Sequence, residues 1–492
     1  MIPILIGTET EYGFTVEGRT VKNQADDAIA FVRSYPDEGY SGWDYRYESP
    51  RSDMRGFQVS QLAYDRRDAE YDRGRQRTSA EDERSDWVLP NGARFYNDHG
   101  HPEYSTPECF SPNQAALHDY AGQTVVCRAA EAYAAETGRE VAVYKNNTDY
   151  SGASYGTHDN FLVPRDIPID ELIQAITPML IARQFLTGAG KVGSESGGPV
   201  RFQLSQRADF FEEAVNLETL SRRPIFNTRD EPHSDSQQWR RMHVITCDAN
   251  LMPSCTARRL FLVQLAIRLL LEGKAPLWRV SDPVRSFKLT SRDLEGDGRI
   301  ETEEGLVTAR SVAESYLDAG SELDLDEESR EHLSECQQLL EARKSNFEWF
   351  KSKVDWAAKY WLLDQFRESE GLSWHDPHMQ SLDLEYHQVS GEDQLFAGLA
   401  EGGFVDALPS DAQVEACLRG DDLDSRALVR SLAVSKWKEH LVTASWTSLV
   451  VRPDLNQQTT EEIKLRPEIR YDEGLRRVES FAEFCQCIKE QA

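Results

Sequence analysis

Residues 2–13 read IPILIGTETEYG and place isoleucine at every second position before two glutamates, Glu9 and Glu11. This period of two predicts a first β-strand that ends in the acidic segment GTETE. Because side chains two positions apart on a strand point to the same side, we expect both glutamates on one face of a sheet. Such carboxylates repel each other unless a cation lies between them. The stretch therefore predicts a β-sheet that carries a charged site.

A second dense group of charges follows at residues 93–109, ARFYNDHGHPEYSTPEC. Residues 87–89, a Pro-Asn-Gly turn at 90–92 and residues 93–96 predict further strand structure. The group adds carboxylates, imidazoles and one arginine to the first strand. Magnesium requires hard oxygen ligands and usually bridges them to nucleotide phosphates. Solvated charges on a surface turn would explain any single glutamate, but the whole set favours a metal–phosphate site.

The rest of the chain mixes helices with strands, which predicts an α+β fold. Ser111 is a candidate N-cap, Pro112 a first helical residue and Gly138 the stop of one long helix. Further helices are expected over 170–186, 254–272, 309–319 and 327–350, and a strand over 141–144. The charge-dense run at 65–86 predicts a mobile loop. A turn region at 402–411 predicts a boundary between a catalytic domain, 1–408, and a small C-terminal domain, 409–492.

The composition argues against several classes of protein. The 492 residues carry a formal charge of −29, from 84 acidic and 55 basic residues, which opposes binding to nucleic acid. The eight cysteines include no CxxC pair, so the sequence predicts no structural zinc. The first residues lack the basic region of a secretory signal, and arginines interrupt the apolar stretch 254–271. We therefore expect a cytoplasmic protein that binds neither nucleic acid nor membrane.

Two motifs point to other functions. Residues 188–193, GAGKVG, match a dinucleotide-binding glycine pattern, but they follow a predicted helix instead of a strand, so we expect a helix-ending loop. Residues 293–304, DLEGDGRIETEE, resemble a calcium-binding EF-hand loop. The flanking residues 287–290, 299–302 and 306–308 read as strands, which favours a surface hairpin, with calcium binding as the alternative.

Further polar stretches contain arginines and histidines at the edges of predicted strands or turns. They are KNNTD at 145–149, SYGTHDN at 154–160, SQR at 205–207, NTRDEPH at 227–233 and RRMH at 240–243. Guanidinium groups that converge from such positions bind phosphates or carboxylates. Structural salt bridges are the alternative, and the sequence leaves open whether Arg240 or Arg241 points inward.

Together, GTETEYG, NGARFY, HPEY, KNNTD, ASYGTHDN, LSQR, NTRDEPHSD and RRMHVI resemble the Pup ligase and deamidase family, relatives of the carboxylate-amine ligases typified by glutamine synthetase. The resemblance implies a glutamine-synthetase-like antiparallel sheet cradle packed with helices, plus a small C-terminal domain. Residues 43–57, WDYRYESPRSDMRGF, resemble the start of an insertion, about 44–86, that the depupylase branch has and the ligases lack. The family's HENY motif stands here as His158-Asp159-Asn160-Phe161.

The resemblance also implies roles for individual residues. Magnesium would be held by Glu9, Tyr96 and Glu103, and ATP would be contacted by Arg94, Thr106 and Trp446. Asp98 would be the catalytic carboxylate, as a base or as a nucleophile. Additional phosphate or substrate contacts are expected from Glu11, His158, Arg207, Arg229, Arg241 and His243.

The implied activity is ATP- and magnesium-dependent hydrolysis on Pup or a similar ubiquitin-like tag, with a functional link to the bacterial proteasome. The reaction would deamidate a C-terminal Gln of the tag and cleave the tag from substrate lysines. One alternative within the family is a ligase that forms the isopeptide bond through a γ-glutamyl phosphate. A nucleotide-bound adaptor that binds the tag without catalysis is the alternative from another class.

Overall fold

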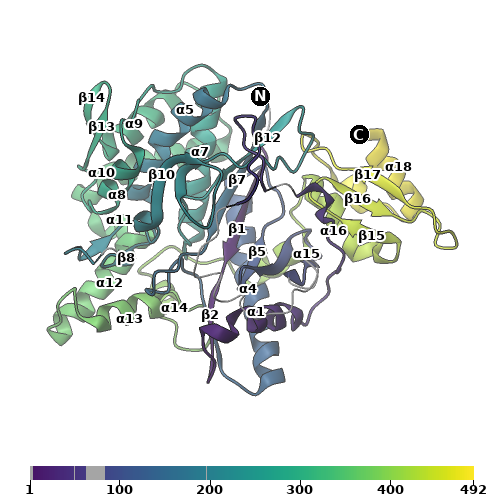
Figure 1. The fold of residues 1–492 in the computed structure, drawn as a ribbon, viewed down its shortest axis with the longest axis horizontal. Coiled ribbons are helices and arrows are strands. Elements are labelled where there is room, and N and C mark those ends of the chain that lie inside the picture. The colour runs from purple at the N-terminus through teal and green to yellow at the C-terminus, as the bar shows by residue number, and fades with distance from the viewer. Residues whose placement is uncertain (1–3, 49, 63–83, 196, 492) are drawn as a thin grey trace.

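A six-stranded sheet forms the centre of the molecule in the computed structural model, which describes residues 4–48, 50–62, 84–195 and 197–491 (Figure 1). Its strand order is β12-β7-β1-β5-β4-β3, and every neighbouring pair is antiparallel. The strands are β1 (Ile6–Glu11), β3 (Trp87–Val88), β4 (Arg94–Asp98), β5 (His101–Ser105), β7 (Thr157–Pro164) and β12 (Trp239–Val244). The predicted α+β fold with an antiparallel sheet is therefore confirmed. Most of the predicted loop at 65–86 lies outside the described residues.

Side chains of the first strand point alternately to the side of the sheet that helices cover and to the uncovered side. Thr10 faces the helix layer, where its hydroxyl donates to Asp119 of α4 (Pro112–Thr137) over 2.7 Å. Glu9 and Glu11 point the opposite way, as the period of two requires. β1 begins at Ile6, later than the isoleucine pattern predicted, and both glutamates lie within the strand.

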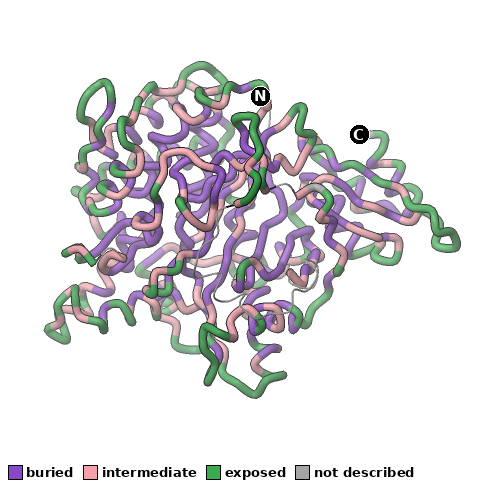
Figure 2. The backbone as a smooth tube through the Cα atoms, viewed as in Figure 1, coloured by how far each residue is buried: buried purple, intermediate pink, exposed green. Residues whose placement is uncertain are grey.

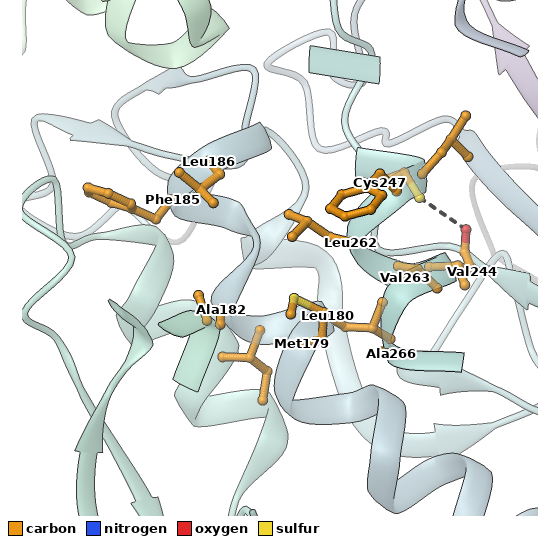
Figure 3. Packing of buried hydrophobic residues seen from close by; sticks show 14 of the residues in the cluster. Met179, Leu180, Ala182, Phe185, Leu186, Val244, Cys247, Leu262, Val263 and Ala266 are labelled. Atoms are coloured by element: carbon orange, nitrogen blue, oxygen red, sulfur yellow. Dashed lines mark hydrogen bonds between the residues drawn. The ribbon is translucent and has the colours of Figure 1, made fainter. Parts of the chain in front are cut away.

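Long helices cover one face of the sheet. Ser111 caps α4 by accepting the amide of Gln114, and Gly138 ends the helix in the left-handed conformation at φ 66°, so both predicted helix signals are confirmed. Beside α4 lies α7 (Pro253–Leu271), which packs on α5 (Ile169–Ala182). Met179 and Leu180 of α5 meet Leu262, Val263 and Ala266 of α7 in the main core (Figure 3). Buried backbone accordingly concentrates in the sheet and these helices (Figure 2).

The EF-hand-like segment forms a hairpin, as expected, of β13 (Arg299–Thr302) and β14 (Gly305–Thr308). The preceding strand predicted at 287–290 is wrong. Those residues belong to α8 (Pro283–Ser291), because Asp282 caps a helix whose first residue is proline. The carboxylates of Glu295 and Asp297 pair with Arg343 and Lys344, at 2.7 and 2.8 Å. These carboxylates therefore have partners within the protein.

The remaining predicted helices are present with small changes of boundary. The segment 170–186 divides into α5 and α6 (Gln184–Thr187), and 327–350 divides at Asn346 into α10 (Glu327–Ser345) and α11 (Phe347–Lys353). The predicted strand at 141–144 is β6 (Val141–Tyr144), and the glycine motif at 188–193 follows α6, as expected for a helix-ending loop. The other elements of the body are β2 (Gly13–Val16), α1 (Gln24–Arg33), β8 (Lys191–Val192), β9 (Phe202–Gln203), β10 (Phe211–Asn216), β11 (Arg223–Asn227), α9 (Ala309–Gly320), α12 (Asp355–Glu370), α13 (Pro377–Tyr386) and α14 (Leu395–Glu401).

The C-terminal segment has a hydrophobic cluster of its own, which runs from Leu423 to Ile488 and includes Trp43 and Val88. It lies to one side of the sheet (Figure 1). The elements around this cluster are α16 (Arg426–Lys436), β15 (Leu441–Ala444), β16 (Ser448–Val451), β17 (Glu461–Lys464), α17 (Glu473–Arg476) and α18 (Phe481–Gln491), whereas α15 (Asp411–Arg419) packs against α4. Trp43 bridges to Ala444, so the segment of the predicted insertion contacts this region directly. Among the described residues, no helix is both long and apolar enough to span a membrane.

Candidate active site

The open face of the central sheet collects the charged residues that the sequence singled out. Glu11 pairs with Glu103 across β1 and β5, and Glu103 pairs with Tyr96 across β5 and β4. On the other side of β1, Glu9 pairs with His158 of β7. Directly paired residues of neighbouring strands point to the same face. The strand register therefore assembles one continuous polar surface.

Three carboxylates form one compact group on this face. One oxygen each of Glu11, Asp98 and Glu103 lies within 4.8 Å of the others. Burial and the charges of the other carboxylates raise the pKa of Glu103 well above its usual range. Burial also raises the pKa of Glu11. A divalent cation would relieve this repulsion, and hard carboxylate oxygens are the donors that magnesium prefers, so the group fits the expected metal.

Glu9 belongs to a second group, with His158 and His243, whose candidate ligand atoms also lie within 4.8 Å of one another. Burial raises the pKa of Glu9, but the hydrogen bond with His158, the nearby His243 ring and the charge of Arg241 outweigh it and hold that pKa well below normal. Burial and Arg241 lower the pKa of His243 to about 3. Both ring nitrogens of His243 are buried and make no hydrogen bond within the described part of the chain. This donor set also suits a cation.

The expected magnesium ligands are thus divided between two adjacent groups. Glu9 lies with the two histidines, whereas Glu103 lies with Glu11 and Asp98. The hydroxyl of Tyr96 donates to Glu103 over 2.6 Å. Burial and the Glu103 charge raise the pKa of Tyr96 well above 10, which keeps the phenol protonated. In this arrangement Tyr96 orients Glu103.

Asp98 lies at the end of β4, where His99 and Gly100 turn the chain with φ of 47° and 86°. Burial raises the pKa of Asp98, but the charges of His99, Arg84 and Arg94 outweigh it, and the net pKa is below normal. The Arg84 guanidinium lies 3.6 Å from the carboxylate. Asp98 therefore stays ionised beside a carboxylate, Glu103, whose pKa is raised.

Arg94 is enclosed by residues from before and after the undescribed segment. Its guanidinium lies over the rings of Trp43 and Tyr96, at 4.3 and 4.0 Å from their centres. Its Nε donates to Asp86 over 2.5 Å, and Nη1 lies 3.5 Å from Glu48. The sequence analysis did not identify Asp86 as a site residue, because Asp86 is the last residue of the charge-dense run that predicts a loop.

A cavity opens beside the Glu9 group, between the sheet and the C-terminal segment. Thr106 and Trp446, 340 positions apart in the sequence, both line it together with Arg426. Trp446 packs edge-on against Trp43, with ring centres 4.9 Å apart. Arg426 donates to Glu108 over 2.7 Å, and its Nη1 is buried without a hydrogen bond among the described residues. Sequence reasoning missed Arg426 because it lies on a helix with no recognisable motif.

The predicted arginines do not all reach the carboxylates. Arg241 does, with Nη1 3.4 Å from Glu9, whereas Arg240 donates to the carbonyl of Ile167, so the question left open by the sequence is answered in favour of Arg241. Arg207 donates to the carbonyl of Ile245 over 2.6 Å. Arg229 donates to Thr219 over 2.9 Å. Among the described residues neither forms an ion pair with Glu9, Glu11, Asp98 or Glu103, although, beside the larger and opposite effect of burial, the charge of Arg207 lowers the pKa of Glu11 and the charge of Asp98 raises that of Arg229.

Asp159, the departure from the HENY pattern, faces the helix layer. Its carboxylate is fully buried and pairs with Arg259 at 2.9 Å and with Arg183 at 3.1 Å. Burial raises its pKa, but the two guanidinium charges outweigh this, and the net pKa is lowered. Asp159 therefore has a structural role on the opposite side of the sheet from the polar surface.

Comparison with known proteins gives a consistent result. The family model described as Pup-ligase protein matches residues 4–450. The depupylase of Acidothermus cellulolyticus is 34% identical over 91% of this chain and 90% of its own, and the Pup deamidase/depupylase of Mycobacterium tuberculosis is 36% identical over the same shares. The Pup–protein ligase of Micrococcus luteus is 35% identical over 74% of this chain and 83% of its own.

Solved structures resemble the fold over nearly the whole chain. The ligase PafA in complex with the prokaryotic ubiquitin-like protein Pup has a TM-score of 0.77 and 26% identity, and the match covers 100% of this chain and 93% of that one. PafA in complex with ADP has a TM-score of 0.71 and 26% identity, covering 89% and 96%.

Proposed function

Because the chain belongs to the Pup-ligase protein family, we propose that it is a Pup deamidase and depupylase. It hydrolyses the side-chain amide of a C-terminal Gln on Pup and the isopeptide bond between Pup and a substrate lysine. The observation that carries this choice over ligation is the contact of the insertion segment with the polar face. Trp43 packs on Arg94 and on Trp446, and Glu48 lies beside Arg94. Agreement with the depupylases over 91% of the chain, against 74% for a ligase, supports it.

The cavity beside Glu9 is the proposed nucleotide site. Trp446 offers an aromatic face to a base, Thr106 offers a hydroxyl, and Arg241 and Arg426 offer guanidinium groups to phosphates. Arg94 is proposed as a further ATP contact. Its guanidinium already binds Asp86 and packs on the Trp43 ring, so it would contact a phosphate while it keeps these two partners.

Magnesium is proposed to bind between the two groups of the polar face. Glu11 and Glu103 would hold it on one side, and Glu9, with His158 and His243, on the other. When bound, the ion neutralises the carboxylates and holds phosphate oxygens. Because like charges raise the pKa of Glu103, this carboxylate favours either a proton or a cation.

Asp98 is proposed to perform the chemical step. As a base, it takes a proton from water as the water oxygen attacks the amide carbon, and it returns that proton to the leaving nitrogen as the C–N bond breaks and ammonia or the lysine amine is released. As a nucleophile, its oxygen attacks the same carbon and the amine leaves with a proton taken from solvent; water then hydrolyses the resulting mixed anhydride and restores the Asp98 carboxylate. Either role requires an ionised carboxylate, which agrees with the lowered pKa of Asp98.

One assay separates the candidate functions. The protein is incubated with ATP, magnesium and either a Pup conjugate or Pup ending in Gln, and the products are followed by gel and mass spectrometry. Release of free Pup and conversion of Gln to Glu support the hydrolase. New conjugates formed from Pup ending in Glu would support the ligase, and binding without product would support the adaptor; either result contradicts the proposed hydrolase.

A further inference from the structure

Trp446, which lines the proposed nucleotide cavity, lies on the short turn between β15 and β16. Ser445 closes this turn, because its hydroxyl accepts the backbone amides of Thr447 and Ser448 at 3.1 and 3.0 Å. These hydrogen bonds fix the backbone and leave the side chain of Trp446 to its neighbours. An aromatic side chain on a turn has several staggered rotamers unless surrounding groups select one of them. The orientation of the indole therefore depends on what packs against it.

A buried arginine lies against this ring. The guanidinium of Arg430, in α16, lies over the Trp446 indole with its central carbon 4.7 Å from the ring centre. Trp43 contacts the same indole from the insertion segment, with the two ring planes at 71°. A cation over an indole binds more strongly when water is excluded, and the side chain of Arg430 is completely buried. Arg430 and Trp43 together therefore hold the indole in one orientation.

Arg430 is itself anchored to the body of the protein. Its Nε donates to the carbonyl of Gly92 over 2.8 Å, and its other two nitrogens donate to the carboxylate of Glu108, with Nη1 at 3.4 Å. Glu108 also accepts Nε of Arg426 over 2.7 Å. At Gly92, where φ is 73°, a Cβ would lie 2.7 Å from the carbonyl oxygen of Ala427, so α16 packs directly on this turn. The guanidinium of Arg430 therefore cannot shift without breaking contacts with two separate parts of the body.

Arg430 differs from Arg426 in its relation to the cavity. Arg426 lines the cavity, and its Nη1 is buried without a hydrogen bond to any described residue, so it can donate to a phosphate. Arg430 is not among the described residues that line the cavity, and each of its guanidinium nitrogens has a partner in the protein. Arg430 can therefore affect a bound nucleotide only through another side chain, and the side chain that it contacts in the cavity wall is Trp446.

We infer that Arg430 is a positioning residue that holds the Trp446 ring in the orientation that receives the nucleotide base. The inference rests on the proposed nucleotide site and adds to it a residue outside the cavity. A side chain that is ordered before binding costs no further entropy when the ligand arrives, and for one side chain this corresponds to roughly two- to tenfold in affinity. Loss of Arg430 should therefore weaken ATP binding without changing the chemical step.

Calorimetric titration of the full-length protein with ATP and magnesium tests the inference. Arg430→Gln should raise the Kd for ATP by roughly two- to tenfold, while kcat for release of Pup at saturating ATP should stay the same. Because ATP binding is measured without Pup, the result is separate from the proposed hydrolysis, whose failure would appear as ATP binding without release of Pup.

Arg183→Gln is the matched control, because it also removes one of two arginines from a buried carboxylate. Asp159 keeps its ion pair with Arg259 in this control. Glu108 likewise keeps its ion pair with Arg426 in the test variant. Since Asp159 faces the opposite side of the sheet from the polar surface, the control should lose stability but bind ATP as tightly as the parent chain.

A double substitution shows whether Arg430 acts through the ring. Once Trp446→Ala has removed the indole, Arg430→Gln should weaken ATP binding little further, because no ring is left to position. A residue that only stabilised the fold would weaken binding by the same factor in both backgrounds. Arg430→Lys keeps a positive charge beside Glu108, so it should fold even if Arg430→Gln does not, and it should still bind ATP more weakly because it has no planar group to lie against the indole.

Three results would overturn the inference. The first is ATP binding to Arg430→Gln and Arg430→Lys as tight as to the parent chain. The second is an equal effect of Arg430→Gln with and without the Trp446 ring. The third is a loss of ATP affinity in the Arg183→Gln control as large as that in Arg430→Gln.

Discussion

Replacement of Asp98 by Asn is the most direct test of the proposed chemistry. The substitution keeps the size of the side chain but removes the charge that His99, Arg84 and Arg94 stabilise. A positioned base contributes about 10²- to 10⁴-fold to a rate, so we expect kcat for release of Pup to fall by about that factor, or roughly 3–5 kcal/mol in activation free energy.

The same substitution also removes one carboxylate from the group that includes Glu11 and Glu103. Loss of a magnesium ligand would therefore resemble loss of a catalyst at a single metal concentration. The two effects separate in a magnesium titration, because a metal-binding defect disappears at saturation and a catalytic defect persists.

The assay is single-turnover cleavage of a Pup conjugate at saturating ATP and increasing magnesium. The matched control is Asp454→Asn, an exposed aspartate in a C-terminal turn, which should retain full activity. If Asp98→Asn turns over at the parent rate, or if excess magnesium restores it, the assignment of Asp98 as the catalytic group is refuted.

Three further measurements test other parts of the structure. Trp446→Ala should raise the KM for ATP several-fold while kcat at saturating ATP changes little, because the ring lines the proposed nucleotide cavity and is not one of the carboxylate groups. A lowered kcat with an unchanged KM would contradict this prediction. Asp159→Asn should lower the free energy of unfolding by about 3–5 kcal/mol in urea, because it leaves two buried guanidinium groups uncompensated, whereas Glu303→Gln, in an exposed pair, should change it by less than about 1 kcal/mol; equal effects would contradict the structural role. Burial raises the pKa of Asp355 to about 6, above the value of about 3.9 in an unfolded chain, so its contribution to stability is complete below about pH 4 and is lost as pH rises through 6. Between pH 4 and 8 the parent protein should therefore lose roughly 3 kcal/mol of its free energy of unfolding through this group, and Asp355→Asn should not show that loss. Urea unfolding curves at both pH values measure the difference. The same pH dependence in parent and variant would show that Asp355 does not titrate in this way.

Local features of the chain were readable from the sequence because they depend on neighbours within a few positions. The cap at Ser111 and the stop at Gly138 fixed the ends of α4, and the alternation in GTETE placed Glu9 and Glu11 on one face. The helix at 287–290 was mistaken for strand, because a short run of mixed residues has no clear period and the decisive signal was the Asp-Pro cap preceding it.

The composition of the site depended on more than these local signals. The sequence by itself indicated which residue types lie on the polar face, through the period of two in the strands and through the stretches that resemble the family. Only the tertiary structure decided their grouping: Glu9 meets His158 through the pairing of β1 with β7, and Thr106 meets Trp446 because a distant segment folds back beside the sheet. Strand register and long-range packing are set by the free energy of the whole fold, since each contact between distant residues closes a long loop at a cost in chain entropy that only the remaining contacts of the fold offset.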